Sequence, residues 1–270
     1  MKRTIHGIIG IAAFVAAIGW TSLKPSNQRN WIEEQRLLPY ATFADDIVHV
    51  RNVRNFRWGP GDQVRTNWEN RTYRLSGIRT VSYVLTPFSV DWRGPAHAFV
   101  SFGFDDGDYV AISIEARREI GEEYSVSRGL LKRFEIMYVV GDERDLIARR
   151  VQNGDDVYVY PIRASRDQVR DLFVEMLERG NRLRQRPEFY GSILNNCTTN
   201  LLAHVNRVAA QPIRYGRQIF LPGYSDQLAY ARGLIDTTLP LDSARAAFRV
   251  NERAARFAGA TDYSLRIRGK

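Results

Sequence analysis

The sequence contains one cysteine among its 270 residues, so no disulfide can form within the chain. This excludes the small secreted folds that disulfides hold together. Histidine is also scarce, at four residues, and these show no close spacing to one another or to the cysteine that is typical of metal ligands. Glycine-rich phosphate-binding loops and internal repeats are absent as well. We therefore expect no metal site and no cofactor.

Acidic residues are fewer than basic ones: the sequence has 30 aspartates and glutamates and 39 lysines and arginines, which gives a net charge of +9. The arginines are scattered along the whole chain, whereas nucleic-acid-binding proteins more often concentrate them in one stripe. Anionic membranes or envelope polymers therefore fit as partners better than nucleic acid does. Hydrophobic residues at 44% and charged residues at 26% indicate an ordinary globular protein with one main core.

The N-terminus carries the long apolar run of the sequence. Lys2 and Arg3 precede apolar residues 7–23, which is the layout of a signal peptide or signal anchor. A cut after Gly19 would leave Trp20 directly behind the cleavage site, so we predict an uncleaved anchor. The run of about 17 residues is at the short limit for a membrane-spanning helix. Its basic start predicts a single pass through the inner membrane by residues 7–23, with the rest of the chain exported.

Residues 1–23 form the predicted anchor segment, and the chain after them divides into three parts. Residues 24–46 contain prolines and mixed charges, and are predicted to form a tether with a short helix at about 31–38. Residues 47–235 are predicted to form the main domain. Residues 236–270 are rich in alanine and arginine, and predict a helical tail that ends in a polar strand or without order.

Alternating or β-branched apolar residues mark the strands of the main domain. We predict strands, or for the second range a pair of strands, at 47–56, 72–88, 96–104, 109–117 and 157–162. Residues 130–140 fit either a strand or a short helix, and residues 165–183 predict a long amphipathic helix. His49, in the first of these strands, is expected on the surface.

A tight turn at residues 105–108, Asp-Asp-Gly-Asp, joins two of these strands into a β-hairpin. If the loop has three residues with Gly107 in the left-handed conformation, His97 lies directly opposite Glu115. A two-residue loop would instead put Ala98 opposite that acid, and Glu115 would point to the other face of the sheet. Another group, such as Ser113 or a backbone carbonyl, would then have to orient His97.

The only cysteine, Cys197, comes at the start of an amphipathic helix, with Asn195 or Asn196 as its N-cap. The apolar residues behind it would bury one face of this helix: Leu201, Leu202, Val205 and Val208. A sulfur in the first turn lies near unpaired N–H groups and the positive end of the helix dipole, which favours the thiolate. The alternative is that Cys197 is a buried thiol that only packs against the sheet.

A histidine on a strand, an acid on the neighbouring strand and a cysteine at a helix start form the set of groups needed for nucleophilic catalysis. His97 would accept the thiol proton of Cys197, and Glu115 would orient the imidazole. Backbone N–H groups at the cysteine would face the oxyanion, and Tyr190, Asn195 and Asn196 just before it are candidates for oxyanion or substrate binding. His204 is a second candidate base, but two helical turns place it about 10 Å along the axis, so we interpret it as a packing or surface residue.

Several separated motifs also resemble one bacterial family. HAFVSFGF, VAISIEARRE, GEEYS, VYVYPI and PEFYGSILNNCTTN, between Trp31 and Ile235, are similar to the Lnb N-terminal periplasmic domain family. The order of histidine strand before cysteine helix is similar to the circularly permuted papain-like enzymes, which include relatives of the NlpC-type peptidases. The resemblance implies a periplasmic α+β domain with a permuted papain-like core, in which an antiparallel sheet packs on the cysteine helix. It also implies that Cys197 and His97 match the catalytic dyad, with Glu115 as a plausible third member.

Two functions remain open from the sequence. The first is a membrane-tethered periplasmic thiol hydrolase or acyltransferase that cleaves an envelope amide or ester through an acyl-enzyme on Cys197. Peptidoglycan peptide, lipoprotein or lipid would each serve as the acyl donor. The second is a non-catalytic envelope module of the same fold, which binds or scaffolds a partner through its arginine-rich surface.

Overall fold

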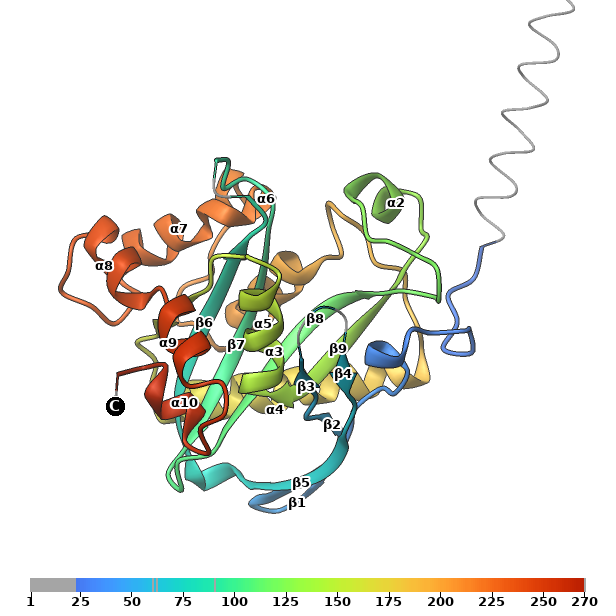
Figure 1. Cartoon of the computed structure of the whole chain (residues 1–270), viewed down its shortest axis with the longest axis horizontal. Coiled ribbons are helices and arrows are strands. Elements are labelled where there is room, and N and C mark those ends of the chain that lie inside the picture. The colour runs from blue at the N-terminus through green and yellow to red at the C-terminus, as the bar shows by residue number, and fades with distance from the viewer. Residues whose placement is uncertain (1–22, 60, 62, 90, 270) are drawn as a thin grey trace, which may run out of the picture.

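The computed structural model describes residues 23–59, 61, 63–89 and 91–269, so the predicted anchor at 7–23 lies outside the described residues except for Leu23. The described part is α+β: a mixed sheet of eight strands carries helices on both faces (Figure 1). No helix in the described ranges is long and apolar enough to cross a membrane.

The large sheet has the strand order β1-β2-β9-β8-β7-β6-β10, with β5 paired to β2 as well. Its strands are β1 Tyr40–Ala44, β2 Ile47–Arg54, β5 Trp68–Arg74, β6 Ile78–Pro87, β7 Ala96–Phe104, β8 Tyr109–Arg117, β9 Glu135–Asp142 and β10 Tyr158–Pro161. A separate two-stranded sheet is formed by β3 Arg57–Trp58 and β4 Val64–Arg65.

One pair of neighbouring strands breaks the antiparallel pattern. β2 and β9 meet in parallel at Arg54 and Gly141, because β2 reaches β9 through a long connection rather than a hairpin. The sheet is therefore mixed, and the expected antiparallel arrangement is confirmed for its other strand pairs but not for this one.

The helices that the structure describes lie between and after these strands. They are α2 Val126–Leu130, α3 Glu143–Gln152, α4 Arg166–Gln185, α5 Cys197–Val208, α6 Arg217–Phe220, α7 Ser225–Ala231, α8 Leu241–Phe248, α9 Asn251–Arg256 and α10 Tyr263–Arg266. Short 3-10 turns are η1 Glu33–Gln35, η2 Leu75–Gly77 and η3 Pro222–Tyr224.

The two faces of the sheet support two separate apolar cores. On one face α4 and α5 pack over alternate residues of β7, including Ala98 and Val100. On the other face α3, α9 and α10 cover the residues between these, including Phe99, and lie in front of the sheet in Figure 1. Side chains alternate along a strand, so β7 is buried on both faces over its whole length.

Most predicted elements are confirmed. Residues 47–56 contain β2, 157–162 contain β10, and 165–183 form α4, which Ser165 and Gln168 begin with a capping box. Residues 72–88 form two strands separated by η2. The uncertain stretch at 130–140 is mostly strand β9, and α2 ends where that stretch begins.

The hairpin of β7 and β8 has the predicted three-residue loop. Gly107 has a φ of 85°, and Phe104 N–H donates to Asp108 O across the loop at 3.0 Å. The ladder pairs Phe99 with Ser113, so the register that would place Ala98 opposite Glu115 is excluded. The backbone ladder between the two strands ends at this pair, and the strand ends beyond it carry His97 and Glu115.

Both ends of the described chain pack more closely than the sequence suggested. The helix expected at 31–38 is only the single turn η1, but Trp31 and Gln35 are buried against the end of β8 and the residues just after it. The C-terminal tail is helical, as predicted. Its end is neither a strand nor without order: α10 buries Tyr263 in the second core, because the sheet face under it is apolar.

Candidate active site

Cys197 is the first residue of α5, and Asn196 is the N-cap. The Asn196 side chain accepts from Thr199 N–H at 3.0 Å, and the Thr199 hydroxyl accepts from Asn196 N–H at 2.9 Å. This capping box holds the first turn, so the predicted helix start at the cysteine is confirmed. The thiol is thereby fixed where α5 meets β7 and β8.

The thiol of Cys197 is buried, with 5% of the residue exposed. Burial raises the pKa of this thiol above its ordinary value, although the N–H groups of Ala98 and Thr198 and the Thr198 hydroxyl, 3.7 Å from Sγ, lower it in part. The sequence predicted that the helix start would favour the thiolate, and for the protein without substrate this is wrong. The loss of water around the sulfur outweighs the helix terminus.

His97 is linked to Glu115 through the hydroxyl of Ser113. The imidazole Nε2 lies 2.7 Å from Ser113 Oγ, and Ser113 Oγ donates to Glu115 Oε1 at 3.1 Å. A hydroxyl has one proton to give, and an ionised carboxylate can only accept. Nε2 therefore carries the proton that it donates to Ser113, and Nδ1 keeps a free lone pair.

The opposite ring nitrogen, Nδ1 of His97, makes none of the hydrogen bonds of the described residues. Nδ1 is also not one of the fully buried polar atoms that lack a partner, so part of it is accessible. Because His97 lines a cavity, we infer that Nδ1 faces that cavity. A neutral imidazole with its lone pair on a cavity is suited to accept a proton.

Gln35 holds the far side of Glu115. Its Nε2 donates to Glu115 Oε2 at 3.0 Å and to Ala116 O at 3.1 Å, and its Oε1 accepts from Arg118 N–H at 2.7 Å. A residue of the predicted tether thus fixes the carboxylate that, through Ser113, orients His97.

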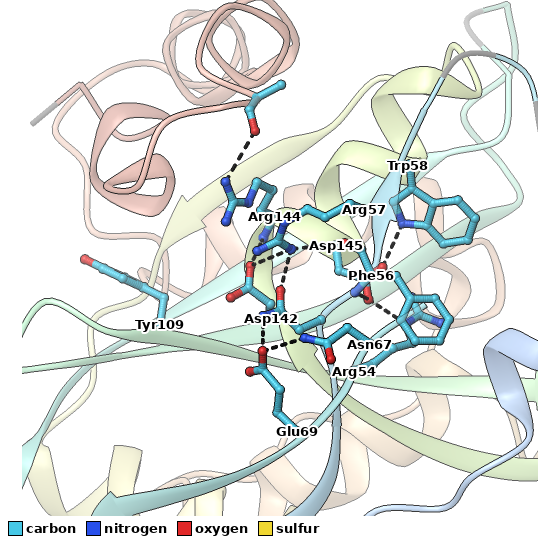
Figure 2. A network of polar contacts seen from close by, with 12 residues as sticks. Arg54, Phe56, Arg57, Trp58, Asn67, Glu69, Tyr109, Asp142, Arg144 and Asp145 are labelled. Carbon is cyan, nitrogen blue, oxygen red and sulfur yellow. Dashed lines mark hydrogen bonds and ion pairs between the residues drawn. The ribbon is translucent and has the colours of Figure 1, made fainter. Parts of the chain in front are cut away.

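A buried ion pair lies beside this carboxylate. Arg54 donates from Nε and Nη2 to Asp145 at 2.9 and 3.2 Å, and both side chains are almost fully buried. Asp145 also accepts from Phe56 N–H and from the Trp58 indole, as Figure 2 shows. The carboxylate of Asp145 therefore ties the end of β2 to α3.

The charges around the relay set its protonation. Burial alone would raise the pKa of Glu115, but the positive charges of Arg54 and Arg150 and the bond from Gln35 outweigh it and lower that pKa. Burial and the charge of Arg150 lower the pKa of His97, against the opposing effect of Glu115. At neutral pH Glu115 is ionised and His97 is neutral.

A cavity of about 370 Å³ brings these groups together. Cys197, His97, Ser113 and Glu115 all line it, together with Tyr190 and several arginines of β2, α3 and the end of β8. It has the size of a small ligand site, and it combines polar groups with apolar walls.

The thiol and the imidazole reach this cavity from different sides of β7. Cys197 packs in the core that contains Ala98, whereas the His97 ring lies 5.6 Å from the ring of Phe99, which belongs to the opposite core. No hydrogen bond joins Cys197 Sγ to His97 among the described residues. The cavity lies at the end of the β7–β8 ladder, and the thiol of Cys197 and the imidazole of His97 both line it.

The three predicted oxyanion residues have different surroundings. Asn195 binds Phe189 O and Asn200, and Asn196 binds Ser192 O and caps α5, so both amides are engaged in holding the loop. Tyr190 lines the cavity, and its hydroxyl lies 3.4 Å from that of Tyr124. Burial raises the pKa of Tyr190, so it is a neutral hydroxyl that can donate a hydrogen bond.

The two other histidines of the described residues lie where the sequence predicted. His204 is a buried residue of α5, with Nε2 2.5 Å from the Tyr138 hydroxyl, and it does not line the cavity. His49 is exposed on β2 beside Thr72. The described residues contain no group of three or more histidine, cysteine, aspartate or glutamate side chains that could hold a metal ion.

Three residues of the site were not assigned a role from the sequence, and Ser113 was predicted to orient His97 only for the hairpin register that the structure excludes. Ser113 shares a strand face with Glu115 two residues on, a spacing that could have indicated the relay. Gln35, Arg54 and Asp145 come from segments 60 or more residues away along the chain from their partners in the site, and no local pattern marks them.

Comparison with known families gives one match. The profile of the Lnb N-terminal periplasmic domain family matches residues 65–231, which include β5 to β10, α2 to α5 and the whole Cys197, His97 and Glu115 set. No curated protein and no solved structure matches the chain.

Proposed function

We propose a function from the premise that this chain belongs to the Lnb N-terminal periplasmic domain family. The protein is a periplasmic thiol hydrolase or acyltransferase, tethered to the inner membrane by residues 7–23, that acts on an amide or ester of the cell envelope. Cys197 is the nucleophile, His97 the general base and acid, and Glu115 the group that orients His97 through Ser113. A permuted papain-like arrangement of these groups is part of the proposal.

The observation that carries the proposal is the shared cavity. One cavity of about 370 Å³ is lined by the only thiol of the chain and by an imidazole whose far nitrogen is held by a hydroxyl, which a carboxylate holds in turn. A purely structural histidine has no need for an open Nδ1 and a buried acid behind it.

The reaction would proceed in two balanced steps. Cys197 Sγ attacks the carbonyl carbon while its proton passes to His97 Nδ1, and the tetrahedral oxygen takes the electron pair of the carbonyl. The pair then returns, the amine or alcohol leaves with the proton from His97, and an S-acyl enzyme remains. Water or an acceptor amine attacks this thioester and restores the thiol. The Thr198 N–H group, which acts on the thiol, and the Tyr190 hydroxyl, which lines the cavity, would donate to the oxyanion.

A neutral thiol beside a neutral base fits this scheme. Because burial raises the pKa of Cys197 and lowers that of His97, the resting pair is uncharged and proton transfer accompanies attack. Entry of substrate would bring the two groups together across the cavity, since catalytic hydrogen bonds are often long without substrate.

One observation favours a second candidate, a non-catalytic envelope binding module. The thiol has a raised pKa, and Thr198 and Ala98 occupy its hydrogen-bonding positions. In that case the cavity would bind a ligand without cleaving it.

An activated ester distinguishes the two candidates. We expect p-nitrophenyl acetate to transfer its acetyl group to Cys197, seen as one acetyl mass on the intact protein and mapped by peptide sequencing. Cys197→Ser should show no adduct at that peptide, and His97→Ala should acylate about a hundredfold or more slowly, because general-base catalysis contributes that much. An adduct that forms equally fast in His97→Ala, or none on Cys197 in the unchanged protein, would support the binding module instead.

A further inference from the structure

Large apolar side chains are exposed together on two adjoining segments at one end of the molecule. We call this surface the apolar tip; its members are Tyr124, Val126, Leu130, Leu131, Ile193 and Leu194. Leu194 is 80% exposed, the highest value among the large apolar side chains of the described ranges that are exposed. Single exposed apolar residues are common on proteins, but a group of six is not.

Direct contacts show that the two segments form one surface. The Ser192 hydroxyl donates to Val126 O at 2.8 Å, and the rings of Tyr124 and Tyr190 meet edge to face at 6.0 Å. A Cβ added to Gly129 would lie only 2.2 Å from Ser192 Oγ, so α2 and the loop before α5 approach each other closely. Figure 1 shows α2 at the edge of the molecule, away from the helices that cover the sheet.

More positive than negative charge borders the tip, because Glu122 and Glu123, directly before Tyr124, are outnumbered by the basic residues around it. Residues 124–133 contain Arg128, Lys132 and Arg133 and no acidic residue. The neighbouring Tyr215, whose hydroxyl donates to Ile193 O at 3.3 Å, adjoins Arg214 in the chain. Exposed leucine, isoleucine and tyrosine bordered by lysine and arginine are typical of surfaces that enter the headgroup region of an anionic bilayer.

The position of the tip relates it to the cavity and to the start of the described chain. Tyr124 and Tyr190 line the cavity and also border the tip, so the cavity extends to this end of the molecule. Ser26 N–H donates to Glu135 Oε1 at 2.9 Å, and Glu135 bridges to Phe189 in the segment that leads to the tip. The chain that follows the predicted anchor therefore reaches the folded domain close to the tip.

We propose that the apolar tip docks into the headgroup region of a phospholipid bilayer that contains anionic lipid. The leucines and isoleucine enter the interface, and the arginines and lysine meet the lipid phosphates. Docking turns the tyrosine-lined side of the cavity toward the lipid surface. The proposal does not depend on catalysis, because a binding module would dock in the same way.

The chain offers a clean probe position, because Cys197 is its only cysteine. In a Cys197→Ser background, Leu194→Cys carries an environment-sensitive NBD fluorophore on the full chain, reconstituted into vesicles of phosphatidylcholine and phosphatidylglycerol. We expect its emission to shift to shorter wavelength and doxyl-labelled lipid to quench most of it. Leu130→Cys, on the other segment of the tip, should behave in the same way and serves if the first variant folds poorly.

The matched control is Leu239→Cys, an exposed leucine between α7 and α8. Figure 1 shows these two helices on the opposite side of the molecule from α2. This fluorophore should stay unquenched. Vesicles without phosphatidylglycerol, and the double change Arg128→Gln with Arg133→Gln, should each reduce the quenching at residue 194. Equal quenching at 194 and 239 would overturn the proposal. So would a blue shift at 194 that doxyl lipid does not quench, which would mean that a second copy or another protein covers the tip.

Discussion

The imidazole of His97 is held by the hydroxyl of Ser113, at 2.7 Å between Nε2 and Oγ, and not directly by a carboxylate. The carboxylate of Glu115 acts one bond further on, where it accepts the hydroxyl proton. The negative charge is thus kept away from the ring. His97 Nε2 donates to Ser113, and Ser113 donates to Glu115, so Nδ1 is the ring nitrogen left to accept a proton. In the proposed reaction Nδ1 would accept the thiol proton.

Replacing Ser113 with alanine removes the acceptor of His97 Nε2–H, so the ring loses its preferred orientation. We expect acylation of Cys197 by p-nitrophenyl acetate to slow about tenfold, because one hydrogen bond to a buried group is worth roughly 1–2 kcal/mol. The control is Ser101→Ala on the same face of β7, whose buried hydroxyl has no partner. If both variants acylate like the unchanged protein, Ser113 does not position His97.

Asp145→Asn should be strongly destabilising. The carboxylate is fully buried and accepts from Arg54, Phe56 N–H and Trp58, and breaking a buried pair leaves the Arg54 charge uncompensated. We expect a loss of about 3–5 kcal/mol in the free energy of unfolding, measured by urea denaturation. Asp236→Asn is the matched control, since Asp236 and Arg163 are both 61% exposed and their pair should contribute nothing measurable. Similar losses in the two variants would contradict this account.

Stability should decrease as the solution becomes acidic, from about pH 6.5 downward. Burial lowers the pKa of His97 and of His204 in the folded protein, so below the unfolded value of about 6.5 the unfolded chain binds more protons. The pKa of Glu115 is also lowered in the folded protein, so below about pH 4.5 the unfolded chain again binds more protons and the free energy of unfolding decreases further. Each histidine contributes a slope of up to about 1.4 kcal/mol per pH unit.

The variant His97→Gln tests this assignment. It cannot titrate, so the dependence of unfolding free energy on pH between 6.5 and 4.5 should become shallower by up to about one proton. Thermal or urea unfolding measured across this range gives the slope. An unchanged slope would mean that His97 is protonated equally in the folded and unfolded chains.

Gly223→Ala should prevent close packing between the loop after β6 and the turn η3. A Cβ at this position would lie 1.1 Å from the carbonyl oxygen of Arg93, a backbone atom that cannot move away alone. We expect a loss of more than about 3 kcal/mol, or no folded protein. Gly259→Ala, where nothing lies within 4 Å of the added carbon, should leave the melting temperature nearly unchanged. A melting temperature for Gly223→Ala within a few degrees of the control would contradict the contact.

The local elements could be predicted because their signals are local. Gly107 in its turn, the alternation along β7 and β8, and the polar residues before Cys197 each specify structure within about ten residues of sequence. From them the hairpin register, the cysteine at a helix start and the packing role of His204 could be derived.

The parts that could not be predicted depend on contacts between distant segments. The parallel contact of β2 with β9 at Arg54, and the bond of Gln35 to Glu115, join residues about 80 or more positions apart, which no periodicity reveals. The protonation of Cys197 depends on whether burial outweighs the helix terminus, and the sequence left both readings of this thiol open. The sequence also did not show that Cys197 and His97 would reach the cavity from different sides of β7.

The pairing of Arg268 with Glu143 bears on the order of events when the chain is made and exported. The two side chains meet at 2.5 Å although 125 residues separate them, and Glu143 is fully buried. A chain that emerges N-terminus first has β7, β8 and β9 available long before α9 and α10 appear to cover them. During that interval an apolar sheet face is open to wrong partners. We therefore expect periplasmic holding chaperones to engage the growing chain, and release to wait for the last helix.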